Sequence, residues 1–328
     1  MEEFRAIEFQ RTRDFSKKLN ATFEFIRQNF KPLGKSILFI AGPAALVGSV
    51  IAGSFMGEFL NLGSTAQSNP EALTSYFLTV SFWGQMLLIF VFLTVSFVVA
   101  IATINCYLIL YDQKKTNQIE VSEVWDQVRK VFWPYLGSSI LFFVLIIIAY
   151  VILLIPIFIL ANISGVLVVF GVIFIIGAII FLIFSSSLTY FIQLYEKKSF
   201  MDAVVRSFKL INNGKWWSTF GLIMVLYLIM MTISYIFIIP YYAVLFTNTL
   251  HSVSTGNEVE PSSSWKIWTI IFFTLYYMAQ MIMYALPNVG IAFQYFNLVE
   301  LKEAKGLMNQ IENLGQSSTP DHRPEEHY

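Results

Sequence analysis

Two long apolar runs of this chain are joined by LYEKKSFMDAVVRSFKLINNGKWWSTFG, residues Leu194 to Gly221. Ser199, with Asp202 three residues later, is typical of a helix N-cap, and Asn-Asn-Gly at 212–214 is typical of a helix end. The spacing between them predicts a helix with one apolar face, formed by Phe200, Val204, Phe208 and Ile211. The stretch therefore predicts a surface helix that lies between two membrane spans.

The composition of the whole chain also indicates a membrane protein. Of its 328 residues, 56% are hydrophobic and only 13% are charged, whereas an average soluble domain has about 25% charged residues. The charges are segregated as well, since residues 131–194 contain no Asp, Glu, Lys or Arg. Such runs predict transmembrane helices. We expect an all-α polytopic membrane protein with six transmembrane helices, at about residues 33–55, 77–111, 132–160, 166–194, 216–246 and 265–298.

The distribution of Lys and Arg predicts the orientation of these spans. Basic residues gather before residue 36, at 114–130, at 197–215 and after residue 300, whereas the loops at 57–76, 156–165 and 247–264 contain none. Basic residues are retained preferentially on the cytoplasmic side of a membrane. Both termini and the charged junctions are therefore expected in the cytoplasm.

Amphipathic helices are expected beside the spans, at about residues 15–30, 119–131, 200–211 and 301–313. In the first of them, Lys17, Lys18 and Arg27 lie largely on the face opposite an apolar stripe. This stripe suits contact with the inner leaflet or with the protein itself, and both contacts can hold. We expect residues 1–314 to form one membrane domain and the polar tail 315–328 to be disordered.

A shift of 84 residues without a gap suggests an internal repeat. The shift aligns Leu110, Tyr111, Asp112 and Lys114 with Leu194, Tyr195, Glu196 and Lys198, and it aligns Trp133 and Gly137 with Trp217 and Gly221. The final junction, at 298–302, keeps the order of Leu, a bulky residue, an acid and Lys. We interpret the six spans as three pseudo-repeated hairpins with amphipathic cytoplasmic interfacial helices. Convergence on common interfacial residues is the alternative.

One junction carries a resemblance to a known family. The order Leu194-Tyr195-Glu196, then Arg206-Ser207, then Gly214-Lys215-Trp216-Trp217, with a span on each side, resembles bacterial six-span membrane proteins related to the membrane domain of glycerophosphoryl diester phosphodiesterases. The resemblance covers most of the chain but rests chiefly on this junction and the topology. It implies a multi-pass protein of the bacterial inner membrane without assigned chemistry. The His and acidic metal site of the soluble phosphodiesterase domain has no counterpart in this sequence.

The residues that usually carry catalysis are scarce. The single cysteine, Cys106, lies in the second predicted span and is expected to be a small buried apolar residue. Of the three histidines, His322 and His327 fall in the tail and His251 falls in an outer loop, so they are not expected to converge on a metal. The sequence predicts no catalytic residue, no metal, no cofactor and no nucleic-acid binding.

Two sets of side chains are candidates for a functional role. Basic residues at the cytoplasmic junctions are candidate contacts of anionic lipid headgroups: Lys114, Lys115, Lys197, Lys198, Arg206, Lys209 and Lys302. Polar residues inside the spans are candidates for the interior of the helix bundle: Gln85, Asn105, Gln193, Gln280, Asn288 and Gln294.

Three functional hypotheses follow from these residues. The first is a non-catalytic membrane protein that binds membrane lipids at its cytoplasmic face and has a possible protein partner. The second is a transporter or lipid-handling permease with a cavity between the three hairpins. The third, an intramembrane enzyme, has the least support. A packed centre favours the first hypothesis, and a central cavity favours the second.

Overall fold

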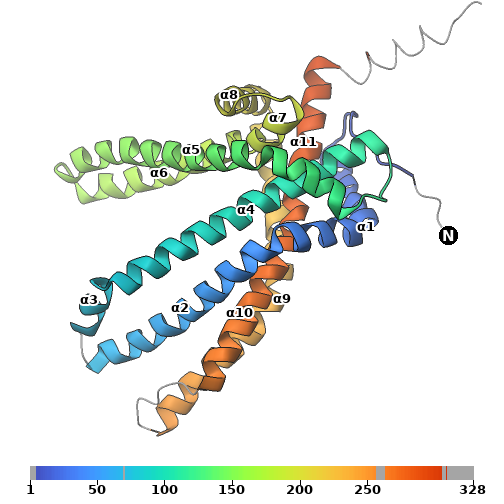
Figure 1. Cartoon of the computed structure of the whole chain (residues 1–328). Coiled ribbons are helices and arrows are strands. Elements are labelled where there is room, and N and C mark those ends of the chain that lie inside the picture. Colours follow the sequence, from blue (N-terminus) through green and yellow to red (C-terminus); the bar gives the residue numbers. More distant parts are fainter. Residues whose placement is uncertain (1–4, 69–70, 256–262, 305–307, 309–328) are drawn as a thin grey trace, which may run out of the picture.

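The structure of the chain, a computed structural model, describes residues 5–68, 71–255, 263–304 and 308. Every regular element in this part is a helix (Figure 1). The helices are α1 (Phe15–Ile40), α2 (Gly42–Ser68), α3 (Glu71–Phe77), α4 (Val80–Lys114), α5 (Val121–Ala161), α6 (Gly165–Ser185), α7 (Thr189–Tyr195), α8 (Phe200–Ile211), α9 (Trp216–Thr255), α10 (Ser263–Met283) and α11 (Ala285–Glu303).

Several helices are long and apolar enough to cross a membrane. Within the described residues, five stretches meet this condition: Val80–Lys114, Val121–Ala161, Gly165–Tyr195, Trp216–Thr247 and Ser264–Glu303. The pair Phe15–Ile40 and Gly42–Phe59, which is bent by 63°, makes a sixth if it is counted as one span. The chain is therefore an all-helical protein with the helices of a membrane protein.

The first bend lies later than the sequence predicted. A break was expected near residues 31–32, between the amphipathic helix 15–30 and the span 33–55, but α1 continues through Pro32 to Ile40. The chain bends at Ala41 instead. Pro43 is the second residue of α2, where its missing N–H leaves no helical hydrogen bond unmade. The bend is therefore placed where proline is tolerated, and residues 33–40 belong to α1.

The other helix ends also differ from the predicted ranges. The segments predicted at 119–131 and 132–160 form one continuous helix, α5. The fourth span ends early at Ser185 and resumes as α7, and the sixth is broken at Tyr284 between α10 and α11. Helix α8 has the predicted bounds, with Ser199 as its N-cap. The segment predicted at 301–313 is described only to residue 304 and at Met308, and the tail 315–328 lies outside the described residues.

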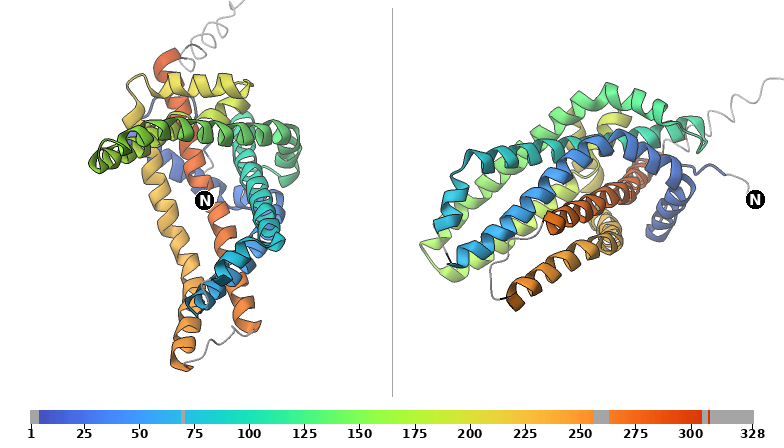
Figure 2. Two further views of the ribbon diagram at one scale, coloured as in Figure 1. Left: turned by 90° about the vertical axis from the view of Figure 1, so that its left-hand side faces the viewer. Right: turned by 60° about the horizontal axis from the view of Figure 1, so that its bottom comes forward.

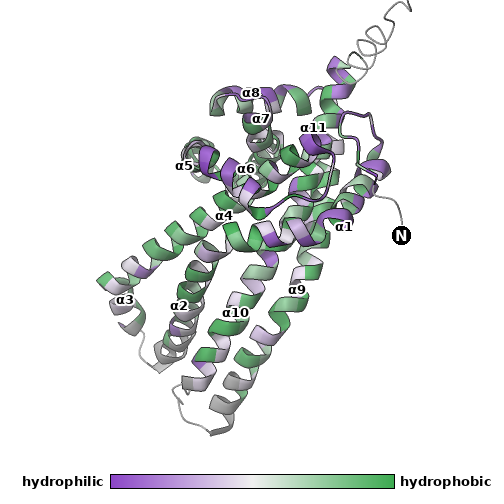
Figure 3. Ribbon diagram, turned by 45° about the vertical axis from the view of Figure 1, so that its right-hand side comes forward, coloured by the Kyte–Doolittle hydropathy of each residue, from purple (hydrophilic) through white to green (hydrophobic). Residues whose placement is uncertain are grey.

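Three helical hairpins diverge from a common end of the molecule (Figures 1 and 2). They are formed by α2 with α4, by α5 with α6, and by α9 with α10. Helix α2 also packs on α10, so the first and third hairpins lie together, whereas the α5–α6 hairpin points in a different direction. Helices α1, α7, α8 and α11 lie at the common end, which we call the collar. Hydrophilic residues gather there (Figure 3).

Candidate functional site

The collar is built around a group of aromatic rings where α4, α7 and α11 end. Tyr195 of α7 contacts Tyr295 and Phe296 of α11, with ring centroids 5.6 and 5.0 Å apart. Phe9, only 2% exposed, lies between Phe296 at 5.2 Å and Tyr111 of α4 at 5.7 Å. We call these five rings the aromatic hub. It joins three helices from distant parts of the sequence.

The segment that carries Phe9 is fixed by hydrogen bonds on both sides of the ring. The Ile7 N–H donates to the Tyr111 hydroxyl at 3.0 Å, and the Arg13 N–H donates to Asn297 Oδ1 at 2.7 Å. The N-terminal segment therefore fills the space between the helix ends. The convergence of the three hairpins is packed with side chains at this level.

The three helices of the hub end with the same backbone conformation. Lys115, Lys197 and Ala304 have φ values of 53°, 53° and 46°, and in the described part they are the only non-glycine residues with positive φ. Each follows shortly after an acidic residue at the end of α4, α7 or α11. The left-handed conformation costs such a residue about 1 kcal/mol. The same backbone conformation therefore recurs at the ends of α4, α7 and α11.

Most of the predicted lipid-contacting cations are engaged inside the protein. The contacts are the ion pairs Lys114–Glu123, Lys115–Asp112, Lys198–Glu196, Arg206–Glu196 and Arg206–Glu303, and the bonds from Lys302 Nζ to the carbonyl oxygens of Lys209 and Leu210. Lys197 and Lys209 are exposed and have no side-chain partner among the described residues. The charges of these two lysines are therefore not used in an ion pair among the described residues.

Glu196 organises the ionic contacts between α7, α8 and α11. Burial alone would raise its pKa, but hydrogen bonds from the Tyr295 hydroxyl at 2.7 Å and from Lys198, together with Arg206, hold the pKa below its ordinary value. The same burial would lower the pKa of Arg206, whereas its pairing with Glu303 and Glu196 raises it. The cluster is therefore ionised at neutral pH and holds the collar together.

A second set of cations was missed by the sequence reasoning. Near the start of the membrane-crossing part of each hairpin, an exposed lysine stands within four residues of an exposed aromatic ring. The pairs are Lys35 with Phe39, Lys130 with Trp133, and Lys215 with Trp217, and the rings are 67%, 73% and 77% exposed. Lys35 Nζ lies 6.0 Å from the Phe39 ring centroid. We call these the lysine–aromatic pairs, and none of the three lysines has a carboxylate partner among the described residues.

Helix α1 presents its two faces in an unexpected way. Its buried face contains Lys18, Phe25 and Asn29, all at most 2% exposed. Lys18 was expected to lie on the outward face with Lys17, and this prediction is wrong. Much of the apolar stripe is exposed instead, at Phe15, Phe23 and Phe30. A helix that buries polar groups and exposes phenylalanines is typical of a protein whose surroundings are apolar.

The buried Lys18 ammonium joins α1 to α9 and α11. Its Nζ donates to Gln294 Oε1 at 2.7 Å and to Ser218 Oγ at 3.2 Å. The other end of the Gln294 carboxamide donates to Thr219 Oγ1 at 2.7 Å. No carboxylate of the described residues lies within ion-pairing distance of Lys18, so neutral oxygens alone hold this cation.

Two further predicted polar residues also connect helices. The Asn105 amide of α4 donates to the Tyr135 hydroxyl of α5 at 3.2 Å, and Gln193 of α7 accepts from Ser138 of α5 at 3.0 Å. Such bonds between helices are the ordinary role of amides within a membrane. They place α5 against the collar.

The remaining three predicted polar residues have other roles. The Asn288 amide bonds the Tyr284 carbonyl of its own chain segment at 2.8 Å. Gln85 donates to Glu58 at 3.2 Å, near the far end of the first hairpin. Gln280 lines a cavity and has no side-chain hydrogen bond among the described residues. The set of six therefore does not form one site.

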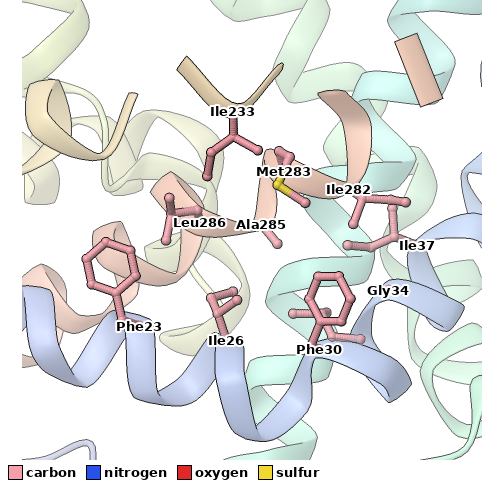
Figure 4. A pocket seen from close by; sticks show the side chains of 11 residues that line it. Phe23, Ile26, Phe30, Gly34, Ile37, Ile233, Ile282, Met283, Ala285 and Leu286 are labelled. Atoms are coloured by element: carbon pink, nitrogen blue, oxygen red, sulfur yellow. The ribbon is translucent and has the colours of Figure 1, made fainter. Parts of the chain in front are cut away.

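A cavity lined almost entirely by apolar side chains lies beneath the exposed stripe of α1 (Figure 4). It has a volume of about 310 Å³, and its lining includes Phe23, Ile26 and Phe30 of α1, Ile233 of α9 and Leu286 of α11. We call this the apolar groove. Lys31 and Lys35 stand on the same turns of α1 as Phe30 and Gly34, which border the groove. A hydrocarbon chain and an anionic group could therefore be bound side by side.

No known protein family, curated protein or solved structure matches the chain. The resemblance to the phosphodiesterase-related membrane domain therefore stays a prediction. Within the described residues, no group of three His, Cys, Asp or Glu side chains could hold a metal ion. The chemical features that the described residues do present are exposed cations, exposed aromatic rings and apolar cavities.

Proposed function

We propose that this chain is a non-catalytic, multi-pass membrane protein whose collar binds anionic phospholipids of the cytoplasmic leaflet. In this proposal the exposed lysines hold headgroup phosphates, and the apolar groove accepts an acyl chain. The observation that carries it is helix α1, which buries Lys18 and exposes Phe23 and Phe30 at the border of the apolar groove, beside Lys31 and Lys35.

The lysine–aromatic pairs support the same conclusion. Tryptophan prefers the headgroup level of a bilayer, and a lysine near an anionic surface contributes about 1 kcal/mol of attraction. One such pair occurs per hairpin. We therefore infer that the collar lies at the inner surface of a bacterial cytoplasmic membrane, with both termini in the cytoplasm, and that the three hairpins are repeats of one unit.

The packing at the centre distinguishes this proposal from a permease. A path between the ends of α4, α7 and α11 would have to pass the aromatic hub, which Phe9 fills. The apolar groove and the cation positions lie at the periphery instead. Peripheral lipid binding needs no such path, and this supports the first of the three functional hypotheses.

The proposal can be tested by measuring lipids retained by the full-length protein. The protein is placed in nanodiscs of phosphatidylglycerol and phosphatidylcholine, transferred to detergent, and weighed by native mass spectrometry. Lys31→Gln with Lys35→Gln should remove about 2 kcal/mol of attraction, which is roughly a thirtyfold loss of phosphatidylglycerol binding. Gly34→Leu should fill the groove and lower acyl-chain retention.

Two controls accompany these variants. Lys266→Gln removes one positive charge at the start of α10, away from the collar, and should leave retention unchanged. A Cβ at Gly34 meets only Ile282 Cγ2 at 4.0 Å, so Gly34→Ala should behave as the unaltered protein. Equal retention of phosphatidylglycerol by the double lysine variant and the unaltered protein would refute the proposal.

A further inference from the structure

A second cavity lies between α4, α9 and α10 and differs in chemistry from the apolar groove. It has a volume of about 290 Å³ and is lined by Ser96, Phe97, Ala100, Tyr227, Met230, Met231, Tyr277, Gln280, Met281 and Tyr284. The break between α10 and α11 separates the two cavities, since Met281 and Tyr284 line this one whereas Ile282 and Met283 line the groove. We call it the tyrosine cavity.

The burial of its lining shows where the tyrosine cavity opens. Ala100, Met230 and Met281 are 2%, 3% and 7% exposed and form its floor. Phe97 and Met231 are 42% and 47% exposed and form its mouth. The mouth therefore lies on the outer surface of the bundle, between α4 and α9.

In the membrane orientation proposed above, on which this step rests, the mouth lies within the bilayer. Met231 is 15 residues after Trp216 in α9, which corresponds to about 22 Å at 1.5 Å per residue. The hydrocarbon core is about 30 Å thick. With Trp216 near the inner surface, Met231 and the mouth face acyl chains rather than water.

Two pairs of hydroxyl groups lie inside the cavity. Ser96 Oγ donates to the Leu93 carbonyl at 2.9 Å, so the contact of 3.0 Å between Ser96 and Tyr277 uses the Tyr277 proton. The Tyr227 hydroxyl donates to the Tyr284 hydroxyl at 3.0 Å. The Tyr284 proton thus remains free to donate to a ligand.

Gln280 adds hydrogen-bonding capacity that the described residues do not use. Its carboxamide carries two donor hydrogens and one acceptor oxygen, and it has no side-chain bond among the described residues. Leaving such a group unbonded in hydrocarbon is unfavourable by 1–3 kcal/mol or more. A ligand with a carbonyl or hydroxyl would satisfy both Gln280 and Tyr284.

The same lining excludes charged ligands. None of the ten lining residues is Asp, Glu, Lys, Arg or His, and an unpaired charge at this depth is strongly disfavoured. The three methionines provide a flexible apolar wall that adapts to irregular shapes. The volume is at the lower end of ligand pockets, so it suits a head group rather than a whole lipid.

We propose that the tyrosine cavity binds the head of an uncharged lipid that carries a carbonyl or hydroxyl group. The head bonds to Gln280 and Tyr284, and the hydrocarbon tail leaves between Phe97 and Met231 into the bilayer. Diacylglycerols and isoprenoid quinones share this chemistry. This site is independent of the anionic lipid positions at the collar.

Photolabelling of the full-length protein in phosphatidylcholine nanodiscs tests this site. Three diazirine probes are compared: a diacylglycerol, an isoprenoid quinone, and an alkane without a head group. At least one of the first two should label peptides that contain residues 96–100, 227–231 and 277–284, and the one that does so identifies the source. Labelling of these peptides by the alkane to the same extent would overturn the proposal.

A substitution in the cavity provides the second arm. Gln280→Leu keeps the size of the side chain and removes its hydrogen bonds, so labelling at these peptides should fall about fivefold, as expected for one hydrogen bond. Gln85→Leu makes the same change at a position bonded to Glu58 and should leave labelling unchanged. Equal labelling of the Gln280→Leu and unaltered proteins, at matched gel-filtration profiles, would also overturn the proposal.

Discussion

The α5–α6 and α9–α10 hairpins are both pairs of long apolar helices, but they differ in how much of their surface is buried against the rest of the protein. In α5, none of the most apolar 18 residues are buried, and in the α6–α7 stretch only 6% are. The corresponding values are 28% in α9 and 22% in the α10–α11 stretch. The more apolar hairpin is thus the less buried one. Hydrophobicity selects the spans, but it does not say which spans face protein.

Polar side chains make that distinction. The buried surface of α9 and α10 includes Ser234 and Thr269, and residues of both helices line the tyrosine cavity. Between residues 140 and 184 the α5–α6 hairpin is almost entirely aliphatic or aromatic. It is attached near the collar, where Phe184 contacts Phe220 with ring centroids 4.8 Å apart. We infer that the rest of this hairpin is surrounded by lipid.

The largest expected effect concerns the two ends of the α5–α6 hairpin. Single cysteines are introduced at Ser122, at the collar end, and at Asn162, in the turn; both positions are exposed. The native Cys106 is buried and should stay silent. A membrane-impermeant maleimide should label Asn162→Cys on intact cells and Ser122→Cys only after permeabilisation. The reverse pattern would show that the inferred orientation is wrong.

The next effect compares a glycine in each region. A Cβ at Gly290 of α11 would lie 2.1 Å from Leu226 Cδ1, whereas a Cβ at Gly177 of α6 meets nothing within 4 Å. Gly290→Leu should therefore lower the free energy of unfolding by about 3 kcal/mol. Gly177→Leu should change it by less than about 0.5 kcal/mol. Unfolding by SDS in mixed micelles measures both, and equal losses would mean that α6 is as closely packed as α11.

A smaller effect is expected from the buried Lys18 ammonium. The α5–α6 hairpin has no buried cation of this kind. Gln294→Leu leaves the Lys18 ammonium with only Ser218 as its described partner and should cost about 2 kcal/mol of stability. Lys18→Met should cost less, and the double variant should cost less than the sum of the two. Lys17, whose side chain is 72% exposed, provides a control as Lys17→Met. If the stability losses of the two single variants add up to that of the double variant in the same SDS assay, Lys18 and Gln294 are not coupled.

Much of the fold could be predicted because its causes are local. Apolar runs gave the positions of the long helices, and helix α8 lies where Ser199 and the Asn-Asn-Gly sequence indicated. The sixth span is broken at Tyr284, three residues before Pro287, which lies in the first turn of α11, where proline is tolerated. The boundary between the first amphipathic helix and the first span was misplaced, because α1 continues through Pro32 and the chain bends at Ala41, just before Pro43 in the first turn of α2.

The candidate site was less predictable because it depends on tertiary contacts. Whether a lysine is free or paired is decided by carboxylates elsewhere in the chain, as for Lys114 with Glu123. The burial of Lys18 depends on Gln294, which is 276 residues away. The lysine–aromatic pairs did have a local signal, namely a lysine within four residues before an aromatic ring near the start of each hairpin.

The position of Phe9 has a consequence for how the protein is made. The Arg13 N–H finds its partner, Asn297, 284 residues later in the chain. At roughly 5–20 residues per second, a ribosome needs about 15 to 60 s to synthesise that interval. During this time the segment around Phe9 has only part of its docking place, because Tyr111 of α4 is already present but the rings of α11 are not. Insertion of the last span therefore completes the assembly and locks the beginning of the chain to its end.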